Sequence, residues 1–379
     1  MKYMGSKRAM LTNGLGTLIS KEVNNYARFV DLFSGASFVS WFVAENNQIP
    51  VLAIDLQKYS TTLAGAVISR TQAFDSSALV ESWITKSAKK RNSSKLWKKS
   101  RELSKHGSDI ASYVHESREL CSIKSKIGPI WNAYGGHYFS PEQALTFDYL
   151  LENLPTNEEE RILCLAACIS SASECVASPG HTAQPFQPTV GAGKFILESW
   201  GKDPLARCKI NLEFLSGKHA FVKGDTITDD AQNILNQLRP TDLVFIDPPY
   251  SGVQYSRFYH VLETIARNTK SVNVDGVGRY PALTERPQSK FSNKGQSFAA
   301  LKELLVGIAN QGSTIIFTFP SDETSNGLSG DLVIDIASEW FNVQNNTSIH
   351  GNFSTLGGNN DNRDARKKSS ELILLFKPR

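Results

Sequence analysis

The strongest constraint on the fold is a short apolar run that stops at two prolines. Residues 242–246 read Asp-Leu-Val-Phe-Ile, and Asp247-Pro248-Pro249-Tyr250 follows directly. An apolar run of this length that ends at prolines is typical of a buried parallel strand. In open α/β sheets, ligands bind just beyond the carboxyl ends of such strands. We therefore expect Asp247 to lie at the edge of a sheet where the chemistry takes place.

The tetrapeptide after this run brings together three binding features. Asp247 supplies a carboxylate, and Tyr250 supplies an aromatic face. Pro248 and Pro249 have a fixed φ and no N–H, so a peptide carbonyl beside them can point into the site. Two acceptors and a stacking ring suit a flat group with an exocyclic amine, such as adenine or cytosine. On the tetrapeptide alone, an ordinary strand followed by a proline turn is the alternative.

Other segments predict the rest of an α/β sheet and a long interruption in it. The further strand-like segments are 29–37 (which continues into a turn and a helix), 51–55, 221–225, 314–320, 341–348 and 372–376. Residues 71–204 contain no convincing parallel strand and have helical patterns, including a capping box at Ser140. The expected fold class is therefore an α/β core, formed by 1–70 and 205–379, with a large and mainly helical insertion at 71–204.

Two turns near the N-terminus have the composition of nucleotide-binding sites. Small residues around Gly35 follow the first strand and would let a ligand approach the backbone at a helix N-terminus. Asp55 ends the second strand about 20 residues later, where ribose hydroxyls lie in nucleotide-binding folds. Gly5, Ser6 and Lys7 could form an anion-binding turn, although a mobile basic N-terminus has the same composition.

Asp247-Pro248-Pro249-Tyr250 resembles the catalytic motif of amino-methylating DNA methyltransferases, and the Asp form is typical of the adenine-N6 enzymes. The ending 366–378 is similar to that of Dam-like enzymes. The order of cofactor turn, insertion and tetrapeptide resembles the alpha group, whose target-recognition region lies between the two motifs. The resemblance implies a Rossmann-like, S-adenosylmethionine-dependent adenine-N6 methyltransferase acting on double-stranded DNA. The setting would be restriction-modification, phage or orphan modification, with any cognate endonuclease acting separately.

The resemblance also implies roles for residues that match the family's motifs. The implied catalytic residues are Asp247, Pro248, Pro249 and Tyr250. The implied cofactor-binding residues are Tyr3, Lys7, Asp31, Phe33, Gly35, Asp55, Asp225 and Asp247. The chain departs from the family at Ser37, which replaces the last glycine of the motif Asp-x-Phe-x-Gly-x-Gly. That change could tighten the turn or weaken cofactor binding.

A basic stretch within the insertion predicts a surface for DNA. Residues 86–126 contain twelve Lys or Arg and four Asp or Glu, a net charge of +8 within a chain of net charge +4. Solvated helix faces would have the same composition. A proline-rich polar loop at 178–188 predicts base contacts, and aromatic residues after the tetrapeptide could stack on bases. The candidate DNA-contacting residues are Lys89, Lys90, Arg91, His181, Gln184, Tyr255 and Tyr259.

Composition excludes several classes of protein. Hydrophobic content of 40% and charged content of 21% are typical of a soluble globular chain. No apolar run approaches the roughly 20 residues that cross a bilayer, and residues 1–8 lack the apolar core of a secretory signal. Five cysteines are a sparse, odd set that suits a reducing cytoplasm. Cys164 and Cys168 lie one helical turn apart; packing is favoured over a zinc pair, and no metal is expected.

Two other functions are compatible with these residues. One is methylation of another amine, such as cytosine N4, an RNA base or a protein amide. Asp at 247 and the Dam-like ending argue against it. The other is a nucleic-acid-binding protein whose cofactor site has decayed, with Ser37 as a symptom. The presence of Tyr3, Lys7 and Asp55 argues against decay.

Overall fold

The computed structural model describes residues 7–105, 109–354 and 366–379, which form two compact units. The sheet unit contains Gly5–Thr71, Ala220–Tyr255 and Gln288–Arg379, and the helical unit contains Gln72–His219 and Ser256–Pro287. These boundaries differ from the division expected at 70/71 and 204/205. The reason is packing: the helix that begins at Pro204 and the segment after Ser256 both pack against the helices of the insertion.

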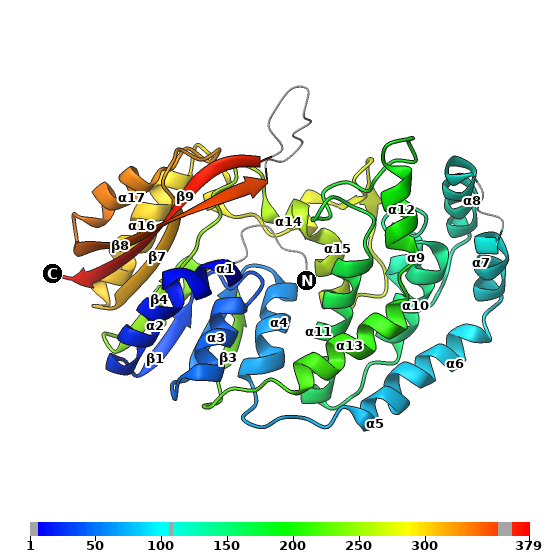
Figure 1. The fold of residues 1–379 in the computed structure, drawn as a ribbon, viewed down its shortest axis with the longest axis horizontal. Helices are drawn as coiled ribbons and strands as arrows, with labels where there is room; N and C mark the ends of the chain where they lie inside the picture. Colours follow the sequence, from blue (N-terminus) through cyan, green and yellow to red (C-terminus); the bar gives the residue numbers. More distant parts are fainter. Residues whose placement is uncertain (1–6, 106–108, 355–365) are drawn as a thin grey trace. The chain divides into compact units, whose positions relative to one another are not determined.

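The sheet unit is built on seven strands in the order β3-β2-β1-β4-β7-β9-β8 (Figure 1). The strands are β1 (Arg28–Asp31), β2 (Val51–Asp55), β3 (Asp225–Thr228), β4 (Asp242–Ile246), β7 (Thr314–Pro320), β8 (Phe341–Ser354) and β9 (Arg366–Pro378). The five neighbouring strands β3, β2, β1, β4 and β7 are parallel. Strand β9 pairs antiparallel with β7 and β8. The predicted α/β class is confirmed. Because β1 has β2 on one side and β4 on the other, the strand order reverses at the β1–β4 pair.

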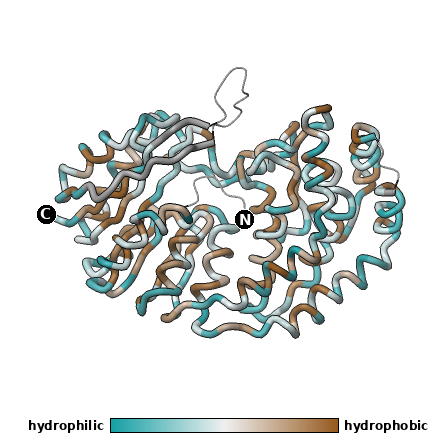
Figure 2. The backbone as a smooth tube through the Cα atoms, in the orientation of Figure 1, coloured by the Kyte–Doolittle hydropathy of each residue, from teal (hydrophilic) through white to brown (hydrophobic). Residues whose placement is uncertain are grey.

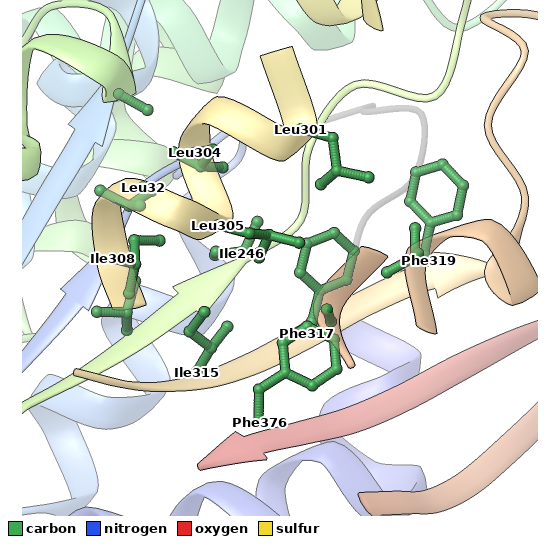
Figure 3. Packing of buried hydrophobic residues seen from close by; sticks show 14 of the residues in the cluster. Leu32, Ile246, Leu301, Leu304, Leu305, Ile308, Ile315, Phe317, Phe319 and Phe376 are labelled. Atoms are coloured by element: carbon green, nitrogen blue, oxygen red, sulfur yellow. The ribbon is translucent and has the colours of Figure 1, made fainter. Parts of the chain in front are cut away.

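The apolar runs of the sequence form the centre of this sheet. All residues of β4 and β7 are buried, as continuous apolar runs predict for strands covered on both faces. On one face, Leu301, Leu304 and Leu305 of α16 pack against Ile315 and Phe317 of β7 (Figure 3). Each such side chain contributes about 1.5–3 kcal/mol on complete burial. The packed core of the sheet therefore fixes the positions of the carboxyl ends of β1, β2 and β4.

Helices cover both faces of the sheet. One face packs against η4, α16 and α17, and the other packs against α3 and α4. The helices of this unit are α1 (Arg8–Met10), η1 (Leu11–Leu15), α2 (Gly16–Glu22), η2 (Val23–Asn25), α3 (Phe38–Asn46), α4 (Lys58–Ile68), η4 (Ala231–Gln237), η6 (Lys290–Ser292), α16 (Ser297–Asn310) and α17 (Gly330–Ala337). Element η4 is a 3-10 helix that the Asp230 side chain caps.

The helical unit buries apolar side chains between its helices, such as Trp83, Phe147 and Leu163. Its elements are α5 (Ser77–Leu79), η3 (Val80–Thr85), α6 (Lys86–Asn92), α7 (Lys95–Lys105), α8 (Ile110–Ser122), α9 (Pro129–Tyr134), α10 (Pro141–Glu152), α11 (Glu158–Cys175), α12 (Gly193–Trp200), α13 (Pro204–Ser216), α14 (Tyr255–Phe258, with Tyr255 in the sheet unit), α15 (His260–Arg267), β5 (Val274–Asp275), β6 (Tyr280–Pro281) and η5 (Leu283–Glu285). The predicted capping box at Ser140 is present. Helix α7 is hydrophilic over most of its length (Figure 2).

Candidate active site

Asp247 follows β4 at the carboxyl edge of the sheet, as the sequence predicts. In the neighbouring strand β1, Asp31 pairs with Phe245 of β4, so both aspartates lie at the same edge. Asp55 ends β2 on the far side of β1. The sheet therefore brings to one edge three carboxylates that are up to 216 positions apart in the sequence. Ligands bind at this position in open α/β sheets.

The carboxylate of Asp247 is held through one of its two oxygens. Oδ1 lies 3.0 Å from Nζ of Lys7 and accepts a 3.1 Å hydrogen bond from Oγ1 of Thr318 on β7. Burial raises the pKa of Asp247 to about 6, and the ammonium of Lys7 offsets part of that effect. The contacts that the described residues make with this carboxylate all use Oδ1. Oδ2 can therefore accept a hydrogen bond from a substrate amine.

Lys7 is buried between two carboxylates. Its Nζ contacts Asp247 and also donates to Oε1 of Glu371 on β9, with only 5% of the lysine side chain exposed. Burial by itself would lower the pKa of Lys7. The attraction of Asp247 and Glu371 outweighs burial and raises that pKa above its ordinary value. The ammonium is therefore charged at neutral pH, and Lys7 contacts the expected catalytic residue directly.

The rest of the tetrapeptide is fixed by its neighbours. The Pro249 carbonyl accepts a 2.9 Å hydrogen bond from Nδ2 of Asn326, a fully buried amide. In the described part of the chain, no donor bonds to the Pro248 carbonyl. The Tyr250 ring packs edge-on against Phe319, with 6.5 Å between ring centroids, and Nζ of Lys7 lies 5.9 Å from its centroid. Of the two proline carbonyls, that of Pro249 is therefore occupied by Asn326, whereas that of Pro248 accepts no hydrogen bond from the described residues.

The turn after β1 has the expected small residues but an unusual backbone at Ser37. Gly35 has a φ of 48°, and Ser37, the N-cap residue of α3, has a φ of 63°. For a residue with a Cβ, this left-handed backbone conformation costs about 1 kcal/mol more than it does for glycine. The Ser37 hydroxyl donates to the Ser60 carbonyl at 3.1 Å, and its N–H donates to the Ser34 carbonyl. These two hydrogen bonds hold the tight turn at Ser37.

Asp55 ties this turn to the second strand. Its Oδ2 accepts from the Gly35 N–H at 2.9 Å and from the Ser60 hydroxyl at 3.0 Å, while Oδ1 accepts from the Gln57 N–H. These bonds fix the carboxylate beside the turn. The structure thus brings together the two parts of the expected cofactor site.

Two further predicted cofactor residues also belong to this edge. Asp31 is buried and accepts a 2.6 Å hydrogen bond from the Ser40 hydroxyl. Burial raises the pKa of Asp31 to about 7, with the hydrogen bond from Ser40 opposing the shift. Phe33 is half-buried and meets Phe291 edge-on at a centroid distance of 5.3 Å. Tyr3 lies outside the described residues.

The placement of Asp225 differs from the prediction. The sequence reading ended the strand at this residue, but β3 begins there, and Asp225 pairs with Leu52 at the start of β2. The carboxyl end of β3 is Thr228, which pairs with Asp55. Three residues of strand span about 10 Å, so Asp225 lies at the wrong end for the cofactor edge. Asp229 is the acid beside that edge, since its N–H donates to the Asp55 carbonyl at 3.0 Å.

The three basic candidates on α6 differ in their surroundings. Lys89 is exposed, with an exposed ion-pair partner in Glu81, and Lys90 is also exposed. Arg91 is only 8% exposed, and its guanidinium stacks 3.6 Å from the centroid of Trp97 and donates to Thr146. The prediction of a DNA contact is wrong for Arg91, because helical periodicity turns it toward the unit's own core.

The loop and aromatic candidates are likewise divided. His181 is half-buried against Phe258, burial lowers its pKa, and its Nδ1 accepts from the Ala183 N–H. Gln184 is exposed, and Tyr255 is half-buried. Tyr259 is 1% exposed, so the expectation that it contacts substrate is wrong. Phe258 is buried.

Three residues at the site had no role assigned from the sequence: Thr318, Asn326 and Glu371. Thr318 is a hydroxyl residue between two phenylalanines of the apolar strand β7, and Glu371 is a lone acid before the apolar run 372–376. Such isolated polar residues in buried strands are the signal that could have identified them. Asn326 lies in a loop and carries no such signal. Among the described residues, no cluster of three or more metal-ligating side chains occurs, and no helix is long and apolar enough to span a bilayer.

The chain is similar in sequence to several curated methyltransferases. The chain is similar to modification methylase LlaI of Lactococcus lactis subsp. lactis, with 23% identity over 389 residues that cover 100% of this chain and 55% of the relative. It is 27% identical over 275 residues to the type II methyltransferase M.FokI of Planomicrobium okeanokoites, covering 70% of this chain and 37% of the relative. It is 24% identical over 315 residues to modification methylase StsI of Streptococcus sanguinis, covering 81% and 42%.

The chain thus spans about half the length or less of these relatives. The model of the D12 class N6 adenine-specific DNA methyltransferases matches residues 3–189 and 202–289. This match includes the turn at Gly35, the acid at Asp55 and the tetrapeptide that begins at Asp247. The chain belongs to the D12 class of N6 adenine-specific DNA methyltransferases.

Proposed function

We propose that this chain transfers a methyl group from S-adenosylmethionine to the N6 amine of adenine in duplex DNA. One observation carries the proposal: Asp247 stands at the carboxyl edge of the sheet, beside Asp31 and Asp55, with Oδ1 held by Lys7 and Thr318. The family implies a methyl donor. A cationic donor with ribose hydroxyls fits an edge that carries three carboxylates and a small-residue turn. S-adenosylmethionine supplies an activated methyl when bound, so no metal is needed.

In the proposed reaction, the chain positions and activates the target amine. The exocyclic amine donates one hydrogen bond to the Asp247 carboxylate and one to the Pro248 carbonyl. These bonds make the nitrogen more nucleophilic and stabilise the positive charge that develops on it. Tyr250 stacks on the base, which must leave the duplex to reach this edge, at a cost of a few kcal/mol. Asn326 supports the arrangement, because it occupies the Pro249 carbonyl.

We also propose roles outside the reacting groups. Lys7, Asp31, Phe33 and Asp55 would hold the cofactor, and Asp229 would replace Asp225 in that set. The helical unit would recognise the DNA target, with Lys89 and Lys90 on phosphates and His181, Gln184 and Tyr255 near bases. The names of the relatives support a modification methylase. We propose that any cognate restriction endonuclease acts as a separate protein.

The rate of methyl transfer is expected to fall as the pH drops below about 6. The reaction needs the ionised form of Asp247, and burial raises the pKa of this group to about 6. The turnover number, measured at saturating DNA and cofactor from pH 5 to pH 8, should therefore rise through an acid limb near pH 6. A turnover number that stays level across this range would contradict the role of Asp247.

Replacement of both Lys89 and Lys90 by alanine is expected to weaken DNA binding and flatten its salt dependence. Each phosphate contact that is lost should lower the slope of log K against log[salt] by about 1. The measurement is the dissociation constant for duplex DNA at salt concentrations between 50 and 200 mM. In this range, proteins that contact several phosphates lose much of their affinity as salt is added. The control is the double variant Lys209→Ala, Lys302→Ala, which removes two other lysines that pair with glutamates. Equal slopes in the two double variants would make Lys89 and Lys90 ordinary solvated lysines.

A further inference from the structure

Glu371 belongs to the environment of the catalytic carboxylate, although it comes from the last strand of the chain. It lies on β9 opposite Pro320 of β7, and it is 6% exposed. Its Oε1 accepts from Nζ of Lys7, and the same nitrogen lies 3.0 Å from Oδ1 of Asp247. Lys7 and Glu371 are 364 positions apart. The buried ammonium of Lys7 therefore joins the partly buried carboxylate of Asp247 to the buried carboxylate of Glu371.

The charge of this group matters for the proposed reaction. Lys7 and Asp247 alone would form a neutral pair, and a neutral pair has little power to stabilise a positive charge on a substrate nitrogen. With Glu371, two carboxylates share one ammonium, and the group has a net charge of −1. Charge effects are much larger in a buried site than in water. The second carboxylate thus leaves negative charge available at the edge where a cation develops.

We propose that Glu371 is a positioning residue that acts on Asp247 through Lys7, an inference that rests on the proposed function. The Glu371 carboxylate fixes the ammonium of Lys7 from one side, and the ammonium fixes Oδ1 of Asp247 from the other. Thr318 completes the hold on the same oxygen. Glu371 also keeps the group negatively charged, so the ammonium does not cancel the charge of Asp247.

This role predicts a shift in the pKa of Asp247 that a purely structural role would not produce. Among the described residues, the charged groups that act on Asp247 are Lys7, Glu371 and Asp31. The neighbouring strand β7 has no ionisable side chain there and contributes only Thr318. The negative charge of Glu371 contributes to the raised pKa of Asp247. Removing that charge should therefore lower the pKa of Asp247 and move the acid limb to lower pH.

The test compares Glu371→Gln, Glu371→Asp and Glu22→Gln with the wild type. Glu371→Gln removes the charge but retains an acceptor for Lys7, while Glu371→Asp retains the charge on a shorter side chain. Glu22→Gln is the matched control, because Glu22 is equally buried and its carboxylate pairs with Lys377, another residue of β9. Turnover is measured against pH, and calorimetry gives the cofactor dissociation constant. The Asp247 carboxyl is titrated by carbon NMR, with Asp247→Asn used to assign its signal.

We expect Glu371→Gln to lower the turnover number by roughly a hundredfold, the lower end of the effect that loss of one charge-stabilising group has in other enzymes. We also expect its acid limb and its Asp247 carboxyl titration to move to lower pH. Glu371→Asp should retain the wild-type titration, and Glu22→Gln should match the wild type in both measurements. An unshifted Asp247 titration in Glu371→Gln would overturn the inference, whatever the change in turnover. Because the titration needs no turnover, an inactive wild type would count against the proposed function alone.

Discussion

Replacement of Asp247 by alanine is expected to reduce methyl transfer by roughly 10³-fold while the protein stays folded. The variant removes the acceptor that would stabilise developing positive charge on the amine, and groups of this kind contribute 10²–10³ in rate. The fold should persist because Lys7 retains its ion pair with Glu371. The measurements are single-turnover methyl transfer, thermal unfolding and cofactor affinity.

Two further variants make the Asp247 result specific. Asp247→Asn keeps the size of the side chain and an acceptor for Thr318 but lacks the charge, so it should be nearly as inactive as the alanine variant. Asp335→Ala removes an exposed aspartate of α17 in the same unit and should behave as the wild type. Normal turnover in Asp247→Ala would remove this residue from the mechanism.

Replacement of Lys7 by methionine is expected to have the largest effect on stability. The carboxylates of Asp247, whose side chain is 17% exposed, and of Glu371, whose side chain is 7% exposed, would lose their shared cation. Removing one partner of a buried ion pair costs about 3–5 kcal/mol. Without the cation, burial raises the pKa of Asp247 further above its unfolded value. A carboxyl of this kind stabilises the fold while it is protonated, and that stabilisation is lost as the pH rises through its folded pKa. The loss of stability in the Lys7→Met variant should therefore be larger at pH 8 than at pH 5.

The midpoint of thermal unfolding at the two pH values tests this expectation. A loss of this size lowers the midpoint by several degrees in a domain of this length. Lys377→Met is the control, because Lys377 is 44% exposed and pairs with Glu22 at 3.4 Å. Partly exposed pairs contribute about 0–1 kcal/mol. A Lys7→Met variant that unfolds at the wild-type temperature at pH 8 would contradict the account of this buried ion pair.

The sheet could be predicted because its strands are continuous apolar runs. The segments 51–55, 242–246 and 314–320 are each bounded by polar residues or prolines, and their order along the chain fits parallel pairing. The prediction of the third strand was wrong by several residues. Residues 221–224 are apolar enough to resemble a strand, but their backbone bonds go to Ala44 and Ile68 instead of β2.

The site could be predicted in part, for a physical reason. The turn at Gly35 and the tetrapeptide at Asp247 are formed by residues that are adjacent in sequence. Their functional groups can therefore be identified from the sequence alone. The burial of a side chain depends on which distant residues pack against it, so it cannot be predicted from the local sequence pattern. The ring of Trp97 covers Arg91, and the ion pair of Lys7 with Glu371 joins the two ends of the chain. Residues of this kind require the structure.

Methyl transfer from labelled S-adenosylmethionine to unmethylated duplex DNA is the most direct test of the central claim. The products are sequenced by a method that detects N6-methyladenine. The account predicts label on adenine within one recurring sequence, together with the loss of that label in Asp247→Ala. Label on cytosine or only on RNA would contradict the assigned substrate, and a chain that binds no cofactor would contradict the assigned activity.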